Sequence, residues 1–118
     1  MLNFNIPDKI IICGIVYDVR LVECDEPIDG LTKKEFIGKI NHESCIIFID
    51  KNINKQAMFQ TFLHEISHGI EYRYCMKIEE DDIDRFAHGM YEIIKDNPNL
   101  FKKIGGLYNN SEMIKGEM

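Results

Sequence analysis

The run His64-Glu65-Ile66-Ser67-His68 constrains this chain most, because its two imidazoles can act together only if the segment is helical. Residues four apart lie on one helix face, so His64 and His68 would face one point about one turn apart. Two such imidazoles can bind one metal ion, and a neighbouring carboxylate can take a proton from a water molecule. The spacing therefore predicts a zinc site with His64 and His68 as ligands and Glu65 as catalytic base.

The residues around this run have the spacing of an amphipathic helix. From Gln56 onward, apolar side chains recur at three- and four-residue steps, which predicts a helix with one buried face. The apolar stripe consists of Phe59, Phe62, Leu63, Ile66 and Ile70. Asn52 and Asn54 are both suitable N-caps. The two histidines lie at the edge of the stripe, where packing would hold them and a cleft could reach them.

The first half of the chain has the pattern of β-strands. Segments 9–13 and 15–22 are rich in Ile and Val, and Gly14 between them predicts a tight turn or bulge. The odd-numbered residues of the second segment are all apolar, which indicates one buried face of an antiparallel sheet. Segments 36–40 and 45–50 flank Asn41-His42-Glu43-Ser44, a predicted hairpin connection, after a turn-rich loop at 25–30. We therefore expect a small antiparallel sheet of about four strands.

The rest of the chain predicts further helices. A second main helix is expected from about Glu79 to Lys95, with acidic residues in its first turn. Its apolar side consists of Ile83, Phe86, Ala87, Met90 and Ile94. Asn97-Pro98 would begin a short C-terminal helix that Gly105-Gly106 ends, followed by a flexible polar tail from about residue 109. The expected class is α+β, as a single domain over residues 1–118.

Composition excludes several classes of protein. The length of 118 residues suits one core, and 45% hydrophobic with 29% charged residues is ordinary for a globular protein. A net charge of −6 argues against a nucleic-acid-binding surface, and no apolar run approaches a membrane span. The N-terminal residues lack the pattern of a secretion signal, so the expected location is the cytoplasm.

The cysteines form no metal-binding or redox pattern. Cys13, Cys24, Cys45 and Cys75 are widely separated and include no Cys-x-x-Cys pair. We expect reduced, mostly buried thiols.

A zinc site that acts on a substrate needs a third protein ligand. The metzincin pattern is excluded because Glu71 and Tyr74 occupy the positions where it requires Gly and His. A thermolysin-like site would use a Glu from the following helix, but Glu92 is nearly opposite Ile83 on the helical wheel and should face solvent. The acidic cluster at 79–82 and 84 is the better source, although its charges would also simply suit a helix N-terminus.

The segment His64-Glu65-Ile66-Ser67-His68-Gly69, followed by Asp82-Ile83-Asp84-Arg85-Phe86-Ala87, resembles the ImmA/IrrE family of zinc metallopeptidases. Residues 90–98 are further similar to its small phage and prophage members, and the resemblance covers roughly residues 9–101. It implies a zincin-like fold, a Zn²⁺ cofactor held by His64, His68 and Asp82, and Glu65 as base. Asp82 stands where Glu is usual, and Ser67 where Gly is frequent. Wheel geometry keeps Glu79 as the second choice for the third ligand.

These residues together predict hydrolysis of a peptide bond. The resemblance implies a specific protein substrate, such as a phage or mobile-element repressor. An exposed strand edge, such as that of 45–50, would hold the substrate in an extended conformation. Tyr72, Tyr74 and Tyr91 are candidates for stabilising the oxyanion, and each would equally serve in packing.

Two other classes fit the same residues. The first is a zinc-binding regulatory or interaction protein that keeps the fold and the metal but cleaves nothing. The second is a metal-free domain whose motif is fortuitous, since shuffling this composition would produce the motif on the order of once in a hundred sequences.

Overall fold

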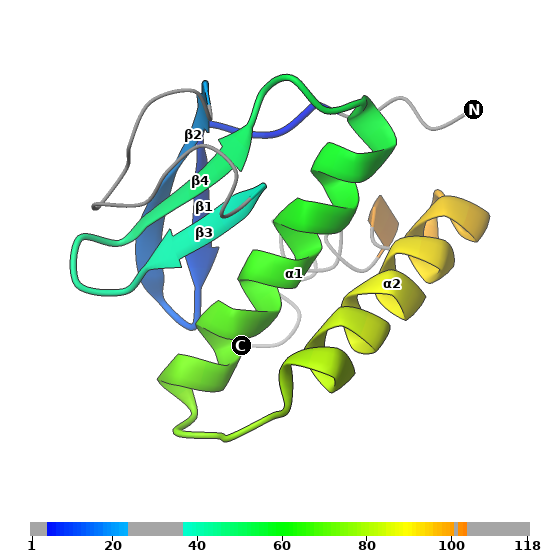
Figure 1. The fold of residues 1–118 in the computed structure, drawn as a ribbon. Coiled ribbons are helices and arrows are strands. Elements are labelled where there is room, and N and C mark those ends of the chain that lie inside the picture. Colours follow the sequence, from blue (N-terminus) through cyan, green and yellow to red (C-terminus); the bar gives the residue numbers. More distant parts are fainter. Residues whose placement is uncertain (1–4, 24–36, 101, 104–118) are drawn as a thin grey trace, which may run out of the picture.

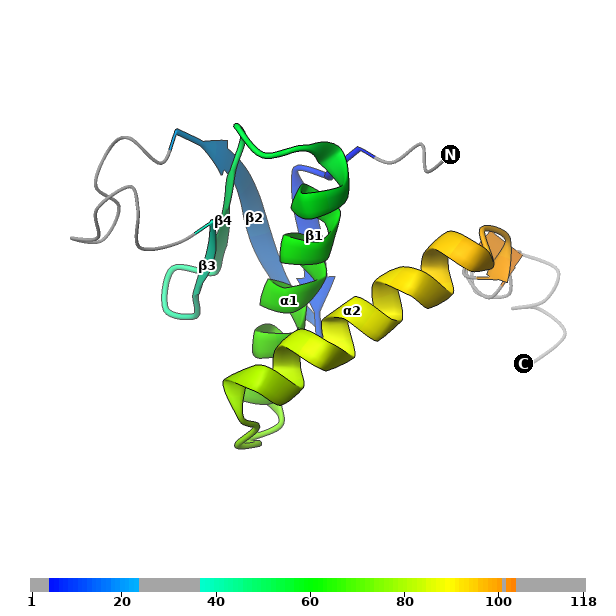
Figure 2. The same ribbon diagram turned by 45° about the vertical axis from the view of Figure 1, so that its right-hand side comes forward.

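A four-stranded sheet is followed along the chain by two long helices, as a computed structural model shows (Figure 1). The structure describes residues 5–23, 37–100 and 102–103. The elements are β1 (Lys9–Ile12), β2 (Ile15–Val22), β3 (Gly38–Asn41), β4 (Ile46–Asp50), α1 (Lys55–Arg73) and α2 (Glu80–Asp96). Helix α1 lies against one face of the sheet, and α2 packs on α1 from the side away from the sheet (Figure 2). The expected α+β class is confirmed.

The sheet is mixed, so the prediction of an antiparallel sheet was wrong. Its strand order is β1-β2-β4-β3, with antiparallel pairs β1–β2 and β3–β4 and a parallel pair β2–β4. β3 follows β2 in the chain but does not pair with it. β4 is antiparallel to β3 and lies between β2 and β3, where it runs parallel to β2. The alternation of apolar residues specifies which face of a strand is buried and not the direction of its neighbour.

Both predicted turns are present. Cys13 and Gly14, with φ of 50° and 85°, form the two-residue connection between β1 and β2. This left-handed backbone favours glycine and matches the twist of a tight hairpin. In the second hairpin, the Asn41 side-chain oxygen accepts hydrogen bonds of 3.0 Å from the backbone N–H groups of Glu43 and Ser44.

The core lies between the sheet and α1. In β2 only Tyr17 and Val19 of the odd-numbered set are buried, while Ile15 and Leu21 at its ends are exposed, because the helix covers only the middle of the strand. The main cluster consists of Ile12, Tyr17, Val19, Ile47, Ile49, Phe59, Phe62 and Tyr91. Loop 25–30, Cys24 and Phe36 lie outside the described residues.

Helix α1 begins where one of the two N-cap candidates predicts. The Asn54 side chain accepts a hydrogen bond of 2.8 Å from the Ala57 N–H, so Asn54 and not Asn52 is the cap. Of the predicted stripe, Phe59 and Phe62 are buried, Leu63 and Ile66 are half-buried, and Ile70 is exposed, so the prediction is wrong for Ile70. Thr61, Glu65 and Gly69 are also buried.

Helix α2 packs on α1 through Ile83, Ala87 and Tyr91, which are buried. The predicted apolar side is therefore correct for Ile83 and Ala87, but Phe86 is 60% exposed. After α2, the Leu100 N–H donates to the Asn97 carbonyl, which begins the helical turn expected after Pro98. Its predicted end at 105–106 and the tail from 109 lie outside the described residues.

The cysteines differ from the expectation of buried thiols. Of the three that the structure describes, Cys13 and Cys75 are exposed and Cys45 is half-buried, and all three are free. Each has a positive φ and stands in a connection between elements, and of the three only Cys45 packs against the core cluster. Within the described residues, no helix combines the length and the apolar character needed to cross a membrane.

Replacing the helix cap should destabilise the fold. Asn54→Ala removes the hydrogen bond to the Ala57 N–H and should lower the free energy of unfolding by about 1 kcal/mol. Asn52→Ala, two residues earlier, removes only an exposed side-chain hydrogen bond to Glu23 and should lower it by less than about 0.5 kcal/mol. Urea unfolding followed by circular dichroism measures both. An equal loss in the two variants would contradict the assignment of Asn54 as cap.

Candidate metal centre

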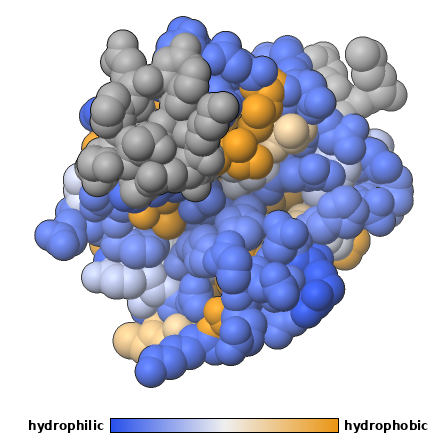
Figure 3. Space-filling view, in the orientation of Figure 1, coloured by the Kyte–Doolittle hydropathy of each residue, from blue (hydrophilic) through white to orange (hydrophobic). Residues whose placement is uncertain are grey.

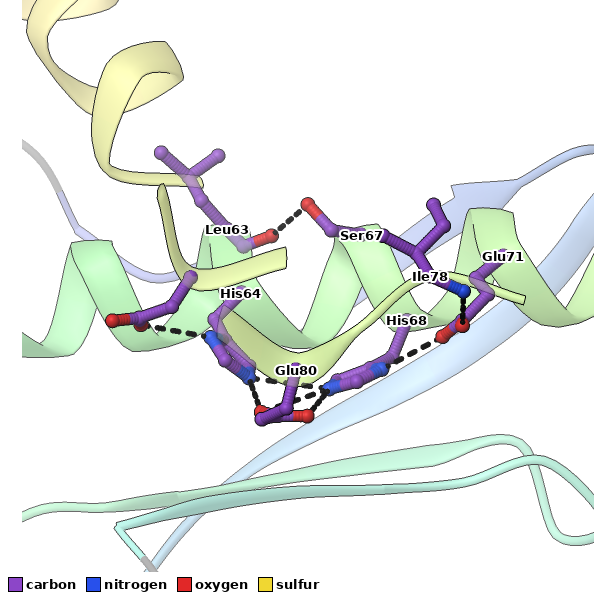
Figure 4. A network of polar contacts seen from close by, with 8 residues as sticks. Leu63, His64, Ser67, His68, Glu71, Ile78 and Glu80 are labelled. Atoms are coloured by element: carbon purple, nitrogen blue, oxygen red, sulfur yellow. Dashed lines mark hydrogen bonds and ion pairs between the residues drawn. The ribbon is translucent and has the colours of Figure 1, made fainter. Parts of the chain in front are cut away.

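His64 and His68 project from one face of α1 toward the first residue of α2, Glu80 (Figure 4). Their Nε2 atoms are 3.2 Å apart. The Glu80 carboxylate meets both rings, with Oε1 at 2.6 Å from His64 Nε2 and Oε2 at 3.0 Å from His68 Nε2. One ligand atom from each of the three residues lies within 4.8 Å of the others. Two nitrogens bound to one tetrahedral zinc ion stand about 3.3 Å apart, so the histidine pair fits such an ion.

The other ring nitrogen of each histidine faces a second carboxylate. His64 Nδ1 is 3.2 Å from Asp84 Oδ1, and His68 Nδ1 is 3.0 Å from Glu71 Oε1. A carboxylate accepts, so the Nδ1–H of each ring can donate to it. With a metal ion at the shared point, each Nε2 would then present its lone pair to the ion. Carboxylates that orient histidines in this way are typical of metal sites. The hydrogen bonds at Nδ1 thus suit the binding of a divalent metal at Nε2, as does the spacing of the two Nε2 atoms.

Glu71 also joins the two helices. Its second oxygen accepts a hydrogen bond of 2.8 Å from the Ile78 N–H, in the connection that leads to Glu80. This backbone hydrogen bond, with the one from His68, lowers the pKa of Glu71. Burial lowers the pKa of His68, but Glu71, Glu65 and Glu80 outweigh burial and raise it overall. Without a metal, these carboxylates therefore stabilise the charged form of the His68 imidazole relative to a solvent-exposed one.

Glu65 lies beside the histidines on the side of α1 that faces β3. It is 7% exposed, and burial raises its pKa although the nearby His64 and His68 act to lower it. Gly38 of β3 makes this packing possible. A Cβ at Gly38 would stand 2.2 Å from Thr61 Cγ2 and 3.2 Å from Glu65 Oε2.

A cleft of about 570 Å³ runs along the site between β3 and the start of α2. Glu65, both histidines and Glu80 lie along it, together with residues 37–40 at β3. The histidine side chains are 17% and 22% exposed, whereas that of Glu80 is 65% exposed. In the space-filling view, most of the surface over α1 and α2 is hydrophilic (Figure 3). The site is thus held by packing on one side and open to solvent on the other.

The structure brings Glu80, and not the predicted Asp82 or Glu79, to the two histidines. The Asp82 carboxylate accepts a hydrogen bond of 2.6 Å from Arg85 Nη2. Asp82 also borders a separate apolar pocket beside Ser67. Glu79 is the N-cap of α2. Glu80 is the first residue of α2, and its side chain reaches the two histidines on α1. Glu92 faces away, as expected, with 55% exposure and an ion pair to His88.

The tyrosines considered for the oxyanion do not line the cleft. Tyr91 is buried edge-to-face against Phe59, and Tyr74 is 67% exposed. Tyr72 stacks on His42, which does line the cleft. His42 was missed by the sequence analysis because nothing in a hairpin connection distinguishes a site histidine from a turn residue.

Comparison of the chain with protein-family models, with curated proteins and with solved structures found no match. The resemblance to the ImmA/IrrE family therefore stays a prediction. What the site can do follows from its own geometry.

Adding a methyl group at Gly38 should disturb the site. Gly38→Ala places a Cβ against Thr61 and Glu65, so we expect a loss of about 1–3 kcal/mol in the free energy of unfolding. Gly89→Ala is the matched control, because its Cβ would meet no atom within 4 Å and Ala favours a helix by roughly 0.5–1 kcal/mol. Urea unfolding should show a lower free energy of unfolding for Gly38→Ala than for the wild type, and a higher one for Gly89→Ala. Stabilisation by Gly38→Ala would refute the close approach of β3.

Neutralising Glu65 should stabilise the metal-free protein near neutral pH. Burial raises the pKa of Glu65, so the folded state holds this proton more tightly than the unfolded chain, and ionisation costs stability above the folded pKa. Glu65→Gln removes this cost and should raise the melting temperature. The gain should shrink as pH falls through the raised pKa and vanish below the ordinary value of 4.5, where both states hold the proton. Glu92→Gln, at an exposed site, should show no such dependence; an equal gain there would contradict the explanation.

Proposed function

We propose that this protein is a zinc-dependent metallopeptidase, of the kind that the ImmA/IrrE resemblance implies, acting on a specific protein substrate. The observation that carries the proposal is the convergence of His64, His68 and Glu80 beside the buried Glu65. Three ligands leave the fourth position of a tetrahedral ion for a substrate molecule. A purely structural zinc site would instead be closed by four protein ligands.

The residues divide into holding and proton-transfer roles. His64, His68 and Glu80 would hold the zinc ion, which when bound supplies Lewis acidity toward water and toward the scissile carbonyl. Glu65 accepts the proton of the attacking water and delivers it to the leaving amine. Burial raises the pKa of Glu65, which makes its carboxylate a better base than an exposed one.

The strand beside the cleft is β3, and it replaces the predicted segment 45–50 as the candidate for holding substrate. β4 is paired on both sides, with β2 and with β3, so it has no edge to offer. β3 is the end strand of the sheet, and residues 37–40 line the cleft. An extended substrate segment that runs beside β3 would pass Glu65. This arrangement favours a peptide over a compact small molecule.

Zinc content tests the metal site. Protein purified without added metal should hold about one zinc per chain, as measured by inductively coupled plasma mass spectrometry. His68→Ala and Glu80→Gln should lose most of it. His88→Ala and Asp82→Asn are the matched controls and should retain it, since neither residue reaches the centre. Absence of zinc from the wild type, even after incubation with Zn²⁺, would contradict the proposal.

Turnover is then tested with Glu65→Gln. This variant should bind zinc like the wild type but lose about 10²–10⁴-fold in cleavage rate, read by mass spectrometry on a proteome-derived peptide library. A wild type that holds zinc but cleaves no more than Glu65→Gln would instead indicate a zinc-binding protein without peptidase activity.

A further inference from the structure

His42 occupies a fixed position on the wall of the cleft. It belongs to the β3–β4 hairpin and lines the same cleft as Glu65 and His68. Its ring lies flat on Tyr72, with centroids 4.0 Å apart and planes within 2°. Such stacking holds the plane of the imidazole, so its polar edge has a defined direction.

The tautomer of His42 follows from the hydrogen bonds behind it. Arg73 donates to the Tyr17 hydroxyl oxygen from Nη2 at 2.8 Å and from Nε at 3.2 Å. A guanidinium has only donors, so the hydroxyl accepts from Arg73 and keeps its own hydrogen to donate. That hydroxyl is 3.4 Å from His42 Nδ1, and Tyr17 is 0% exposed. Nδ1 therefore accepts, and the ring proton resides on Nε2.

His42 is also kept neutral. Burial lowers its pKa, the positive charges of Arg73 and His68 lower it further, and Glu71 acts in the opposite sense. Arg73 is anchored in turn, since its guanidinium lies 5.1 Å from the centre of the Tyr72 ring. The chain thus holds an uncharged imidazole with one N–H at the cleft wall.

Among the described residues, the side chains around the metal position offer a substrate no other N–H donor, although Lys39 and Gln60 carry donors elsewhere along the cleft. Its acidic groups Glu65, Glu80 and Asp84 are acceptors when ionised. The Nε2 atoms of His64 and His68 face the metal position, so they cannot donate to a substrate. A peptide in this cleft brings carbonyl oxygens that lose water on binding and need an N–H partner.

We propose that His42 is a substrate-binding residue whose Nε2–H donates a hydrogen bond to a backbone carbonyl oxygen of a peptide in the cleft, with Tyr17 and Arg73 as positioning residues. This inference rests on the proposed peptidase function. It gives the cleft a substrate-binding donor on His42, whereas none of the oxyanion candidates Tyr72, Tyr74 and Tyr91 lines the cleft.

Two hydroxamates test the proposal on the zinc-loaded full chain by isothermal titration calorimetry. A short peptidyl hydroxamate offers backbone carbonyls to the cleft, whereas acetohydroxamate offers only its metal-binding group. His42→Ala should weaken the peptidyl probe about 3- to 10-fold, the value of one neutral hydrogen bond, and leave acetohydroxamate unchanged. His42→Gln, which keeps an N–H donor, should recover part of the loss. His88→Ala, an exposed histidine on α2, should bind both probes like the wild type.

Nitrogen-15 NMR of the metal-free protein gives a second readout. His42 should carry its proton on Nε2, and Tyr17→Phe should turn this single tautomer into a mixture. A proton on Nδ1 in the wild type would overturn the inference.

The outcomes separate the inference from the function on which it rests. If the wild type binds neither hydroxamate, the metallopeptidase proposal fails and the role of His42 fails with it. If the wild type binds both, and His42→Ala either binds both equally well or weakens both equally, only the role of His42 fails.

Discussion

The hydrogen bonds of the Glu71 carboxylate hold together parts of the site that the sequence keeps apart. One oxygen accepts from His68 and the other from the Ile78 N–H. The first bond sets the tautomer of a histidine on α1, and the second fixes the chain just before α2 begins. Since Glu80 is the first residue of α2, the same side chain aims one proposed ligand and positions another. The geometry of the proposed metal centre therefore depends on how α1 ends as much as on the motif within it.

The site also depends on a buried carboxylate that destabilises the fold when it is ionised. Gly38 has no side chain, so β3 can pack closely over Glu65 and bury it. This burial raises the pKa of Glu65. An ionised carboxylate in this place opposes folding, but it suits a base that acts near neutral pH. Removing the carboxylate would favour the fold and remove the chemistry. Such opposition between stability and activity is typical of catalytic sites.

The sequence predicted best what depends on local spacing. The helix that carries His64 and His68 follows from a pattern within one segment. Its cap was predicted as Asn52 or Asn54, and the structure selects Asn54. Glu80 could not be chosen over Asp82 because five acidic residues compete there, and the helix start decides which of them points back. The parallel pairing of β2 with β4 is not encoded in the alternation of either strand. His42 is positioned by the Tyr17 hydroxyl, 25 residues away in sequence. That hydroxyl accepts in turn from Arg73, which is 56 residues from Tyr17.

The insertion of β4 between β2 and β3 has a consequence for how the chain reaches its native state. The β1–β2 and β3–β4 hairpins and helix α1 can each form from neighbouring residues. The β2–β4 pairing, by contrast, closes a long stretch of chain and joins Asp18 to Ile46. Long-range strand pairing is slow compared with helix formation, because the entropy of closing the loop is lost before the new contacts form. We therefore expect the two histidines to be arranged on a nascent helix before the docking of the second hairpin gives the cleft its wall.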